Sequence, residues 1–425
     1  MTTAVFLLSL MGAMALGMPI AIALLVCGIA LMLQMGMFDS QILAQKLIDG
    51  ADTFPLMAVP YFLLAGELMN AGGLSKRIVT AATSMVGHIR GGLGYVVIGT
   101  GLVLASLSGS AIADTATLAV MLVPLIRQAG YDMNRSCGLI AATGIIAPSI
   151  PPSVGFVLFG VTANVSIIKL FVAGVVPGLL MALSLVVVWW WISRNGTEPL
   201  QPKKSLKEVI VAIKGALWAM GMPFIVIGGL KFGIFTPTES AIVATAYTLL
   251  VSLIVYRDLS ARAFYDAALG AAKTSAVIMF MVAASQVSSW LLTVANIPDQ
   301  LVQLLTPFMN DKILLMALMM VIVYLVGMAL DFTPGILILT PVLMPVVRAA
   351  GIDPVYFGVL FIINNAIGMI TPPVGVVLNV VCGVAKIPME DAIRGVIPFL
   401  IAETAVLVLL VLFPAMVMVP AKWFY

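Results

Sequence analysis

"IAPSIPP" runs from Ile146 to Pro152, and "GMITPP" runs from Gly368 to Pro373. Both stretches lie inside segments that are apolar enough to be membrane helices. Adjacent prolines end a helix, because each proline lacks an N–H and clashes with the preceding turn. A bilayer core offers no water to the freed backbone groups, and each group left unpaired there is costly. The two stretches therefore predict irregular backbone at membrane depth that lines a cavity or is buried in protein.

The composition predicts a helical membrane protein. Of the 425 residues, 62% are hydrophobic and 9% are charged, whereas a soluble domain carries about 25% charge. Four charge-free runs each exceed the ~20 residues that one spanning helix needs. These runs cover residues 136–168, 170–193, 274–298 and 354–385. A β-barrel would show short alternating segments instead. We therefore expect an all-α polytopic protein in a lipid bilayer, and the net charge of +3 gives no sign of nucleic-acid binding.

The N-terminal segment Met1–Phe38 carries no charge and contains Gly17, Met18 and Pro19 near its middle. It lacks the basic start and the Ala-x-Ala site that a cleaved signal peptide shows. We expect one kinked membrane helix here that is retained in the protein.

Three sequence matches at one offset predict an internal repeat. The members of each pair are 221 residues apart: "VPLIRQAGYD" (Val123–Asp132) and "MPVVRAAGID" (Met344–Asp353), Pro151-Pro152 and Pro372-Pro373, and "GVVP" from Gly174 and "GVIP" from Gly395. Hydrophobic segments interrupted by Gly or Pro at matching positions of two repeats point to the binding site of a secondary transporter, whose repeats are often inverted. We expect two inverted repeats over residues 1–193 and 215–425, joined by a polar linker at 194–214.

A polar tip precedes each proline break. "SLSGSAIADTAT" (Ser106–Thr117) and "MALDFTPGILIL" (Met328–Leu339) are flanked by apolar arms that are each too short to cross a bilayer alone. Two short arms around a polar tip predict a re-entrant helical hairpin. We expect hairpins at about residues 94–127 and 313–348, and proline-broken membrane helices at about 136–168 and 354–385.

The tips and breaks supply oxygen atoms that suit sodium, a hard cation. In the first repeat, Ser108, Gly109 and Ser110 can meet carbonyl groups near Gly144. The corresponding residues of the second repeat are Asp331, Thr333, Gly368 and Thr371. This pattern predicts two sodium sites flanking a substrate pocket, with freed carbonyls taken up by the cations. The alternative is that these small and hydroxyl residues only pack membrane helices together.

Acidic residues in apolar surroundings are functional candidates by default in a membrane. Asp114 is expected to cap the second helix of its hairpin, because an acid near a helix N-terminus satisfies free N–H groups. For Asp331, capping and ion ligation remain equally open. Glu67 is expected to pair with Lys76 or Arg77, with a place against a partner subunit as the alternative.

The paired tips, the Pro-Pro breaks and "FPLMAVPYFLLAGELMNAGGLSKRI" (Phe54–Ile78) together resemble a known family. The chain is similar over essentially its whole length to the large membrane subunit of tripartite ATP-independent periplasmic (TRAP) transporters. The resemblance implies the fold of the ion transporter superfamily, with a scaffold and an elevator-type transport domain. It also implies a bacterial inner-membrane location, a small four-helix membrane subunit, and a periplasmic binding protein that delivers an organic acid. A sodium gradient drives import in this family, and no other cofactor is implied.

The resemblance also places the site by motif match, on the hairpin tips and the proline breaks. The sodium ligands implied are Ser106, Ser108, Gly109, Ser110, Gly144, Asp331, Thr333, Gly368 and Thr371. The substrate-binding residues implied are Ser108, Ser110, Pro152, Thr333, Thr371 and Pro373. The overall likeness is to the branch that carries diketogulonate or a related sugar acid, and a dicarboxylate is the other organic acid considered.

Three alternative functions are considered for the same residues. A stand-alone sodium–dicarboxylate symporter of the same superfamily would work without a binding protein. An intramembrane enzyme would need a motif such as Gly-x-Gly-Asp or His-Glu-x-x-His, and the chain has one histidine and neither motif. A passive channel is disfavoured by two duplicated hairpins with ion-type ligands, which favour alternating access.

Overall fold

The secondary structure is helical throughout the part of the chain that the structure describes. The structure is a computed structural model that describes residues 2–194 and 202–422, and these residues form no strand. Nine of their helical segments are long and apolar enough to cross a bilayer, and a pair bent by 44° at the first Pro-Pro break makes a tenth. The prediction of an all-α polytopic membrane protein is therefore confirmed.

The helices of the first half are α1 (Thr2–Ala15), α2 (Ile20–Gln34), α3 (Ser40–Ala51), η1 (Phe54–Met57), α4 (Ala58–Ala71), α5 (Leu74–Val86), α6 (Gly92–Ser108), α7 (Ala111–Gln128), α8 (Met133–Gly144), η2 (Ala147–Ser149), α9 (Val154–Ala163) and α10 (Ile167–Ser193). Those of the second half are α11 (Leu206–Lys231), α12 (Pro237–Leu250), η3 (Val251–Tyr256), α13 (Ala261–Val294), α14 (Ile297–Leu305), η4 (Thr306–Phe308), α15 (Lys312–Ala329), α16 (Phe332–Ala349), α17 (Pro354–Gly368), α18 (Val376–Ala385), α19 (Met389–Leu412) and α20 (Ala415–Lys422).

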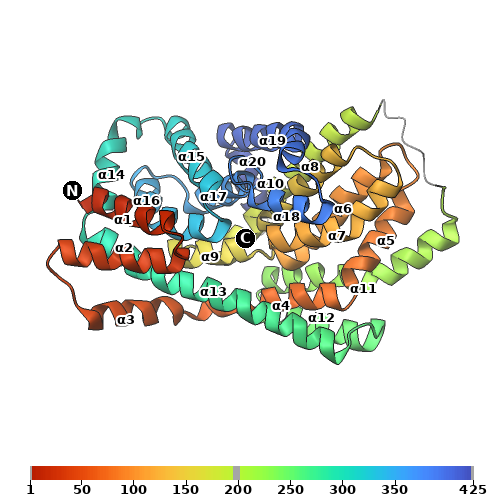
Figure 1. The fold of residues 1–425 in the computed structure, drawn as a ribbon, viewed down its shortest axis with the longest axis horizontal. Coiled ribbons are helices and arrows are strands. Elements are labelled where there is room, and N and C mark those ends of the chain that lie inside the picture. Colours follow the sequence, from red (N-terminus) through yellow and green to blue (C-terminus); the bar gives the residue numbers. More distant parts are fainter. Residues whose placement is uncertain (1, 195–201, 423–425) are drawn as a thin grey trace.

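Two sequence-based boundaries change in the structure. The expected single kinked helix at the N-terminus is wrong, because α1 and α2 are two short helices that pack side by side (Figure 1). Gly17 adopts a positive φ of 76° between them, and Pro19 precedes α2. The polar linker predicted at 194–214 falls partly on residues 195–201, which lie outside the described residues. Its last part is helical, since α11 begins at Leu206 with a Ser205–Glu208 capping box.

Each polar tip is the turn of a helix–turn–helix unit. In the first unit α6 ends at Ser108 and α7 starts at Ala111, so the turn is shorter than the polar stretch in the sequence. In the second unit α15 and α16 take the same form. The helices α7 and α16 begin at residues 111 and 332 and end at 128 and 349, an offset of 221 at both ends. The helices α8 and α17 also begin at this offset, at 133 and 354.

The second helix of each hairpin packs against the other half of the chain. Its partner is the short helix that follows the other Pro-Pro break, so α7 packs on α18 and α16 packs on α9. The long helix α13 runs along the edge of the molecule below α9 and α16 in Figure 1 and contacts α2, α3, α4 and α16. This arrangement brings both hairpin tips toward one region next to α13.

Aromatic side chains fill the core where the two halves meet. Phe159 of α9 lies with its ring centroid 6.2 Å from that of Phe357 and 5.6 Å from that of Phe361. All three side chains are fully buried. Tilted aromatic pairs at these separations add to the burial of apolar area, so the broken helix of the first half is packed firmly onto α17.

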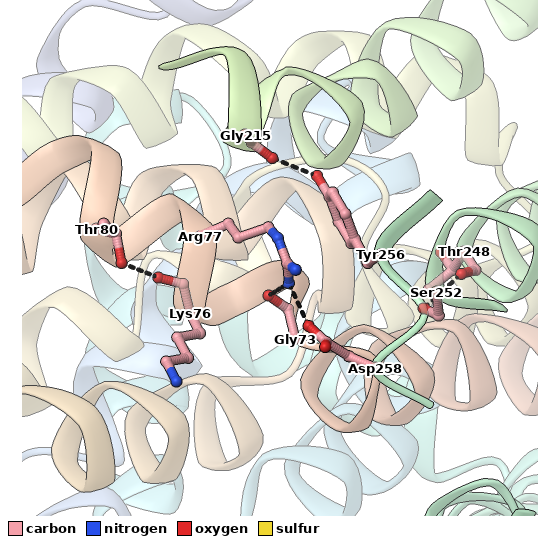
Figure 2. A network of polar contacts seen from close by, with 9 residues as sticks. All are labelled: Gly73, Lys76, Arg77, Thr80, Gly215, Thr248, Ser252, Tyr256 and Asp258. Carbon is pink, nitrogen blue, oxygen red and sulfur yellow. Dashed lines mark hydrogen bonds and ion pairs between the residues drawn. The ribbon is translucent and has the colours of Figure 1, made fainter. Parts of the chain in front are cut away.

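A polar network joins α5 to the later helices α11 and η3 (Figure 2). Arg77 Nη1 donates to Asp258 Oδ2 (2.6 Å) and to the carbonyl of Gly73 (3.1 Å). The guanidinium also lies 3.8 Å from the centroid of the Tyr256 ring, and the Tyr256 hydroxyl donates to the Gly215 carbonyl (2.6 Å). Gly73 adopts a φ of 76°, which glycine tolerates without strain. The motif around "NAGGLSKR" is therefore a structural junction.

Candidate functional site

The first hairpin tip is held by three side chains around one turn. Ser108 Oγ accepts a hydrogen bond from the Ser110 N–H (3.2 Å) and donates to Asp114 Oδ1. Ser110 Oγ accepts from the Ala113 N–H and caps α7. Asp114 was expected to be this cap, and that expectation is wrong, because Ser110 already occupies the capping position. The carboxylate of Asp114 instead lies buried behind the tip.

Gly109 lies directly against the first Pro-Pro break. Its φ is +62°, and a Cβ at this position would lie 2.5 Å from the Pro152 carbonyl oxygen and 2.8 Å from Ser153 Cα. Both facts require glycine here, because other residues rarely adopt this φ and the contact leaves no room for a Cβ. The tip and the break therefore form one unit, as the sodium prediction requires.

Protein groups satisfy part of the backbone freed by the breaks. At the first break, Ser153 Oγ donates to the Pro148 carbonyl (2.6 Å) and accepts from the Phe156 N–H (3.3 Å). At the second break, Asn379 Nδ2 donates to the Val374 carbonyl (2.9 Å). Both Pro-Pro bonds are cis. Side chains thus take up carbonyl groups that sequence reasoning assigned to a cation alone.

The second hairpin tip is capped by its own acid. Asp331 Oδ1 accepts from the Phe332 N–H (2.7 Å) at the start of α16. Asn365 Nδ2 donates to the Phe332 carbonyl (2.8 Å), which ties the tip to α17. The Asn365 Oδ1 atom lies so close to Gly335 that a Cβ there would be 2.7 Å from it. Of the two roles left open for Asp331, capping is therefore present, and it does not exclude ion ligation by the same carboxylate.

The second break contacts the hairpin through glycine and threonine. A Cβ on Gly368 would lie 2.5 Å from the carbonyl carbon of Gly327 in α15, so the two backbones touch. Thr371 Oγ1 donates to the Ile367 carbonyl (2.8 Å) and lies 3.3 Å from the Tyr324 hydroxyl. The hydroxyl of Thr371 is buried within this contact and not turned toward an open space.

Both tips meet in one cavity of about 530 Å³. Four residues predicted for the site line it, namely Gly109, Ser110, Asp331 and Thr333. The other predicted residues, which are Ser106, Ser108, Gly144, Pro152, Gly368, Thr371 and Pro373, are not among its lining residues. The hydroxyl of Ser106 donates back to the Val103 carbonyl of its own helix (2.6 Å). The structure therefore brings the two tips together, and Met369 is the residue of the two breaks that lines the cavity with them.

Several buried oxygen atoms near the tips have no hydrogen-bond partner within the protein. In the first half they are Asp114 Oδ2, Thr115 Oγ1 and Thr143 Oγ1, and in the second half Asn364 Oδ1 and Asn365 Oδ1. Gly144 packs so closely on Thr115 that an added Cβ would overlap the Thr115 hydroxyl. A buried polar atom without a partner is costly, so these atoms are candidates for contact with a bound ligand.

Sequence reasoning missed Thr143, Asn364 and Asn365. A signal was present, because the pair Thr143-Gly144 and the pair Asn364-Asn365 are related by the same offset of 221 residues. Two adjacent asparagines in an apolar helix are also unusual and expensive to bury without partners.

Helices α4 and α13 also line the cavity, together with the start of α7, Val154 of α9 and Met369 after α17. Glu67 and Lys273 contribute charged groups to it. The expected pairing of Glu67 with Lys76 or Arg77 is wrong, because Arg77 pairs with Asp258 and neither Glu67 nor Lys76 belongs to an ion pair among the described residues. Glu67 faces α13 instead.

The comparisons with known proteins agree with this architecture. The family model described as "Tripartite ATP-independent periplasmic transporter, DctM component" matches residues 7–416. The 2,3-diketo-L-gulonate TRAP transporter large permease protein YiaN of Escherichia coli (strain K12) is 51% identical over 423 residues, which cover 100% of both chains. The isethionate TRAP transporter permease protein DctMQ of Oleidesulfovibrio alaskensis is 38% identical, with 95% of this chain and 64% of that protein covered.

One solved structure supports the fold alone. The crystal structure of the Alcanivorax borkumensis YdaH transporter, which its authors describe as having an unusual topology, superposes with a TM-score of 0.65 at 15% sequence identity. The match covers 89% of this chain and 90% of that one. From the family model and from relatives that match its full length, this chain belongs to the DctM family, the large permease component of the TRAP transporters, which is a family of transporters and not of enzymes.

Proposed function

We propose that this chain is the permease subunit of a sodium-coupled secondary importer for an organic acid. The observation that carries the proposal is the single cavity into which both hairpin tips project Gly109, Ser110, Asp331 and Thr333. A transporter needs one place where the coupling ion and the substrate meet, and hydroxyl, carboxyl and backbone groups of two hairpins converge here.

Sodium is the coupling ion best suited to these ligands. In the first half we assign it to the backbone around Ser106, Ser108, Gly109, Ser110 and Gly144, and in the second half to Asp331, Thr333, Gly368 and Thr371. The unpartnered oxygens of Asp114, Thr143 and Asn365 support the assignment, because a bound cation would satisfy them. For the substrate we assign Ser110 and Thr333 as direct contacts, and Ser108, Pro152, Thr371 and Pro373 as residues that shape the tips and breaks.

The substrate is proposed to be a sugar acid. The Escherichia coli relative, which is 51% identical over its full length, is named for 2,3-diketo-L-gulonate. Both the length of the match and the identity support a related compound here, with a dicarboxylate as the other organic acid to test.

The domain organisation is proposed to be two inverted repeats that form a scaffold and an elevator-type transport domain. The offset of 221 residues between the ends of α7 and α16 supports the repeats. The hairpins and proline-broken helices would then belong to the moving domain, and α4, α11, α12 and α13 to the scaffold.

Two partner proteins and a location complete the proposal. We place the chain in the bacterial inner membrane, with a small four-helix membrane subunit and a periplasmic binding protein that hands over the acid. The isethionate relative supports a membrane partner, because more than a third of that permease protein lies outside the match with this chain.

Reconstituted uptake tests the proposal. Proteoliposomes that hold the permease and its small subunit, supplied with the binding protein, should take up 2,3-diketo-L-gulonate only with an inward sodium gradient. Uptake that persists when choline replaces sodium, driven by a pH gradient, would contradict sodium coupling. Equal uptake without the binding protein would favour a stand-alone symporter instead.

A further inference from the structure

Two charged side chains in the cavity are not used by the proposed sodium sites. Lys273 of α13 and Glu67 of α4 both line the cavity. Glu67 lies against α13 one helical turn before Lys273, since a Cβ built on Gly270 would be 3.8 Å from the Glu67 carboxylate. Neither residue belongs to the ion pairs Lys46–Asp49 and Arg77–Asp258, and both side chains line the cavity.

Lys273 is the one cationic side chain among the described residues that line the cavity. Its neighbours on the same face of α13 are Thr274 and the apolar residues Ala271, Val277 and Ile278. An ammonium group has three hydrogen-bond donors and no acceptor. Among these neighbouring side chains, only Thr274 carries an acceptor. Lys273 is exposed, so water supplies the other acceptors until a ligand with a carboxylate occupies the cavity and replaces it.

We propose that Lys273 binds the carboxylate of the transported acid and that Glu67 accepts hydrogen bonds from its hydroxyl groups. The inference rests on the transport function proposed above and narrows its substrate to a hydroxylated monocarboxylate. Lys273 is the one lysine in the cavity lining and can pair with one carboxylate, and with Asp331 assigned to sodium, a second substrate carboxylate would meet the like charge of Glu67. Hydroxyl groups, by contrast, find partners in Ser110, Thr274 and Thr333.

The ordinary alternative is that Lys273 snorkels. A lysine at the start of an apolar helix segment can lay its stem along the surface and keep its ammonium in water. The residues after it in α13, from Thr274 to Val294, are uncharged, which fits that alternative too. If Lys273 only snorkels, the acid does not change the solvent access of position 273. If Lys273 binds the carboxylate, the bound acid covers this position.

Covalent labelling separates the two explanations. The variant Lys273→Cys is made in a chain whose Cys27, Cys137 and Cys382 are replaced by Ala, and is reconstituted with the small subunit and the binding protein. Treatment with 2-aminoethyl methanethiosulfonate forms a disulfide that carries a primary ammonium. We expect it to restore most of the lost uptake of 2,3-diketo-L-gulonate, and we expect the acid to slow the labelling. Arg262→Cys, on the same helix and outside the cavity lining, is the matched control whose labelling the acid should leave unchanged.

Concentration dependence gives the second readout. Lys273→Gln should raise the half-saturating concentration of the acid about ten- to hundredfold, the scale of a lost charged hydrogen bond, while the sodium dependence stays the same. Lys273→Arg should raise the half-saturating concentration by less, and Arg262→Gln should have the half-saturating concentration of the wild type. Gluconate, a hydroxylated monocarboxylate, should inhibit uptake of the acid more strongly than succinate, a dicarboxylate. In Glu67→Gln the inhibition by the two compounds should become more similar.

Specific results would overturn the inference. Unchanged kinetics of Lys273→Gln, or labelling of the introduced cysteine at the same rate with and without the acid, would leave Lys273 as a snorkelling residue. Succinate that competes as well as gluconate would refute the monocarboxylate class. Failure of sodium coupling is a separate result, because it shows in wild-type uptake and does not alter the protection measured at position 273.

Discussion

Arg348, near the end of α16, donates a hydrogen bond of 2.7 Å to the carbonyl of Ala163 at the end of α9. In the other half, Arg127 near the end of α7 donates one of 2.5 Å to the carbonyl of Ala385 at the end of α18. Each hairpin therefore caps the short helix that follows the opposite proline break. A cation at a helix C-terminus pairs with the last carbonyls and with the negative end of the helix dipole, so the two halves hold each other in place reciprocally.

Loss of these caps should weaken the packing of the hairpins. Arg348→Gln and Arg127→Gln should each lower the free energy of unfolding by about 0.3–1 kcal/mol, the usual size of a charge at a helix end. The double variant should lose about the sum, because the two caps share no residue. Thermal unfolding of the purified protein in detergent measures the effect.

A matched control is Arg262→Gln, whose side chain is exposed on α13. It should leave the unfolding temperature unchanged. Unfolding temperatures of both cap variants equal to the wild type would show that the cross-half hydrogen bonds contribute nothing to stability.

Gly109→Ala should abolish uptake while the protein still inserts and folds. An alanine at a φ of +62° costs about 1–2 kcal/mol in backbone strain, and its Cβ would press on the Pro152 carbonyl. The tip would then move away from the break. Gly99→Ala in α6, the helix that leads into this tip, has open space around it and is the control that should transport normally. Normal uptake by Gly109→Ala would show that tip and break need not touch.

Ser108→Ala should raise the sodium concentration that gives half-maximal uptake. The hydroxyl bridges the Ser110 N–H and Asp114, so its loss frees a buried carboxylate and loosens the tip. A buried polar group left without its partner costs about 1–3 kcal/mol, which corresponds to roughly five- to hundredfold in sodium concentration. Titration of sodium at saturating acid measures it. An unchanged titration would mean that Ser108 takes no part in holding the ion site.

The fold class was predictable from the sequence, because charge-free runs and proline pairs are local features. The position of the first hairpin turn was predictable too, whereas the capping by Ser110 was not, because the sequence also offers Asp114 for that role. Partners far apart in the chain were not predictable. Arg77 pairs with Asp258, 181 residues away, and nothing near Arg77 in the sequence identifies that partner.

The cavity wall was missed for a similar reason. Glu67 and Lys273 belong to helices that are adjacent only after folding, and each alone reads as a surface or interface charge. Asn364 and Asn365 were missed although the repeat offset places them opposite Thr143 and Gly144. The repeat was found from motifs of similar sequence. The pairs Thr143-Gly144 and Asn364-Asn365 differ in residue type, so sequence similarity did not reveal them.

The two proline pairs give the last prediction. Pro151→Ala with Pro152→Ala should let the helix continue and pair its carbonyls internally, since alanine restores the N–H and removes the ring clash. The Pro152 carbonyl would then leave its place against Gly109, and the proposed ion site would lose backbone oxygens. We expect normal membrane insertion and lost uptake, and the same for Pro372→Ala with Pro373→Ala. Protease protection measures membrane insertion, and proteoliposomes measure uptake. Transport by both double variants would make the breaks mere packing kinks, whereas transport by one would confine the essential cation site to the other half.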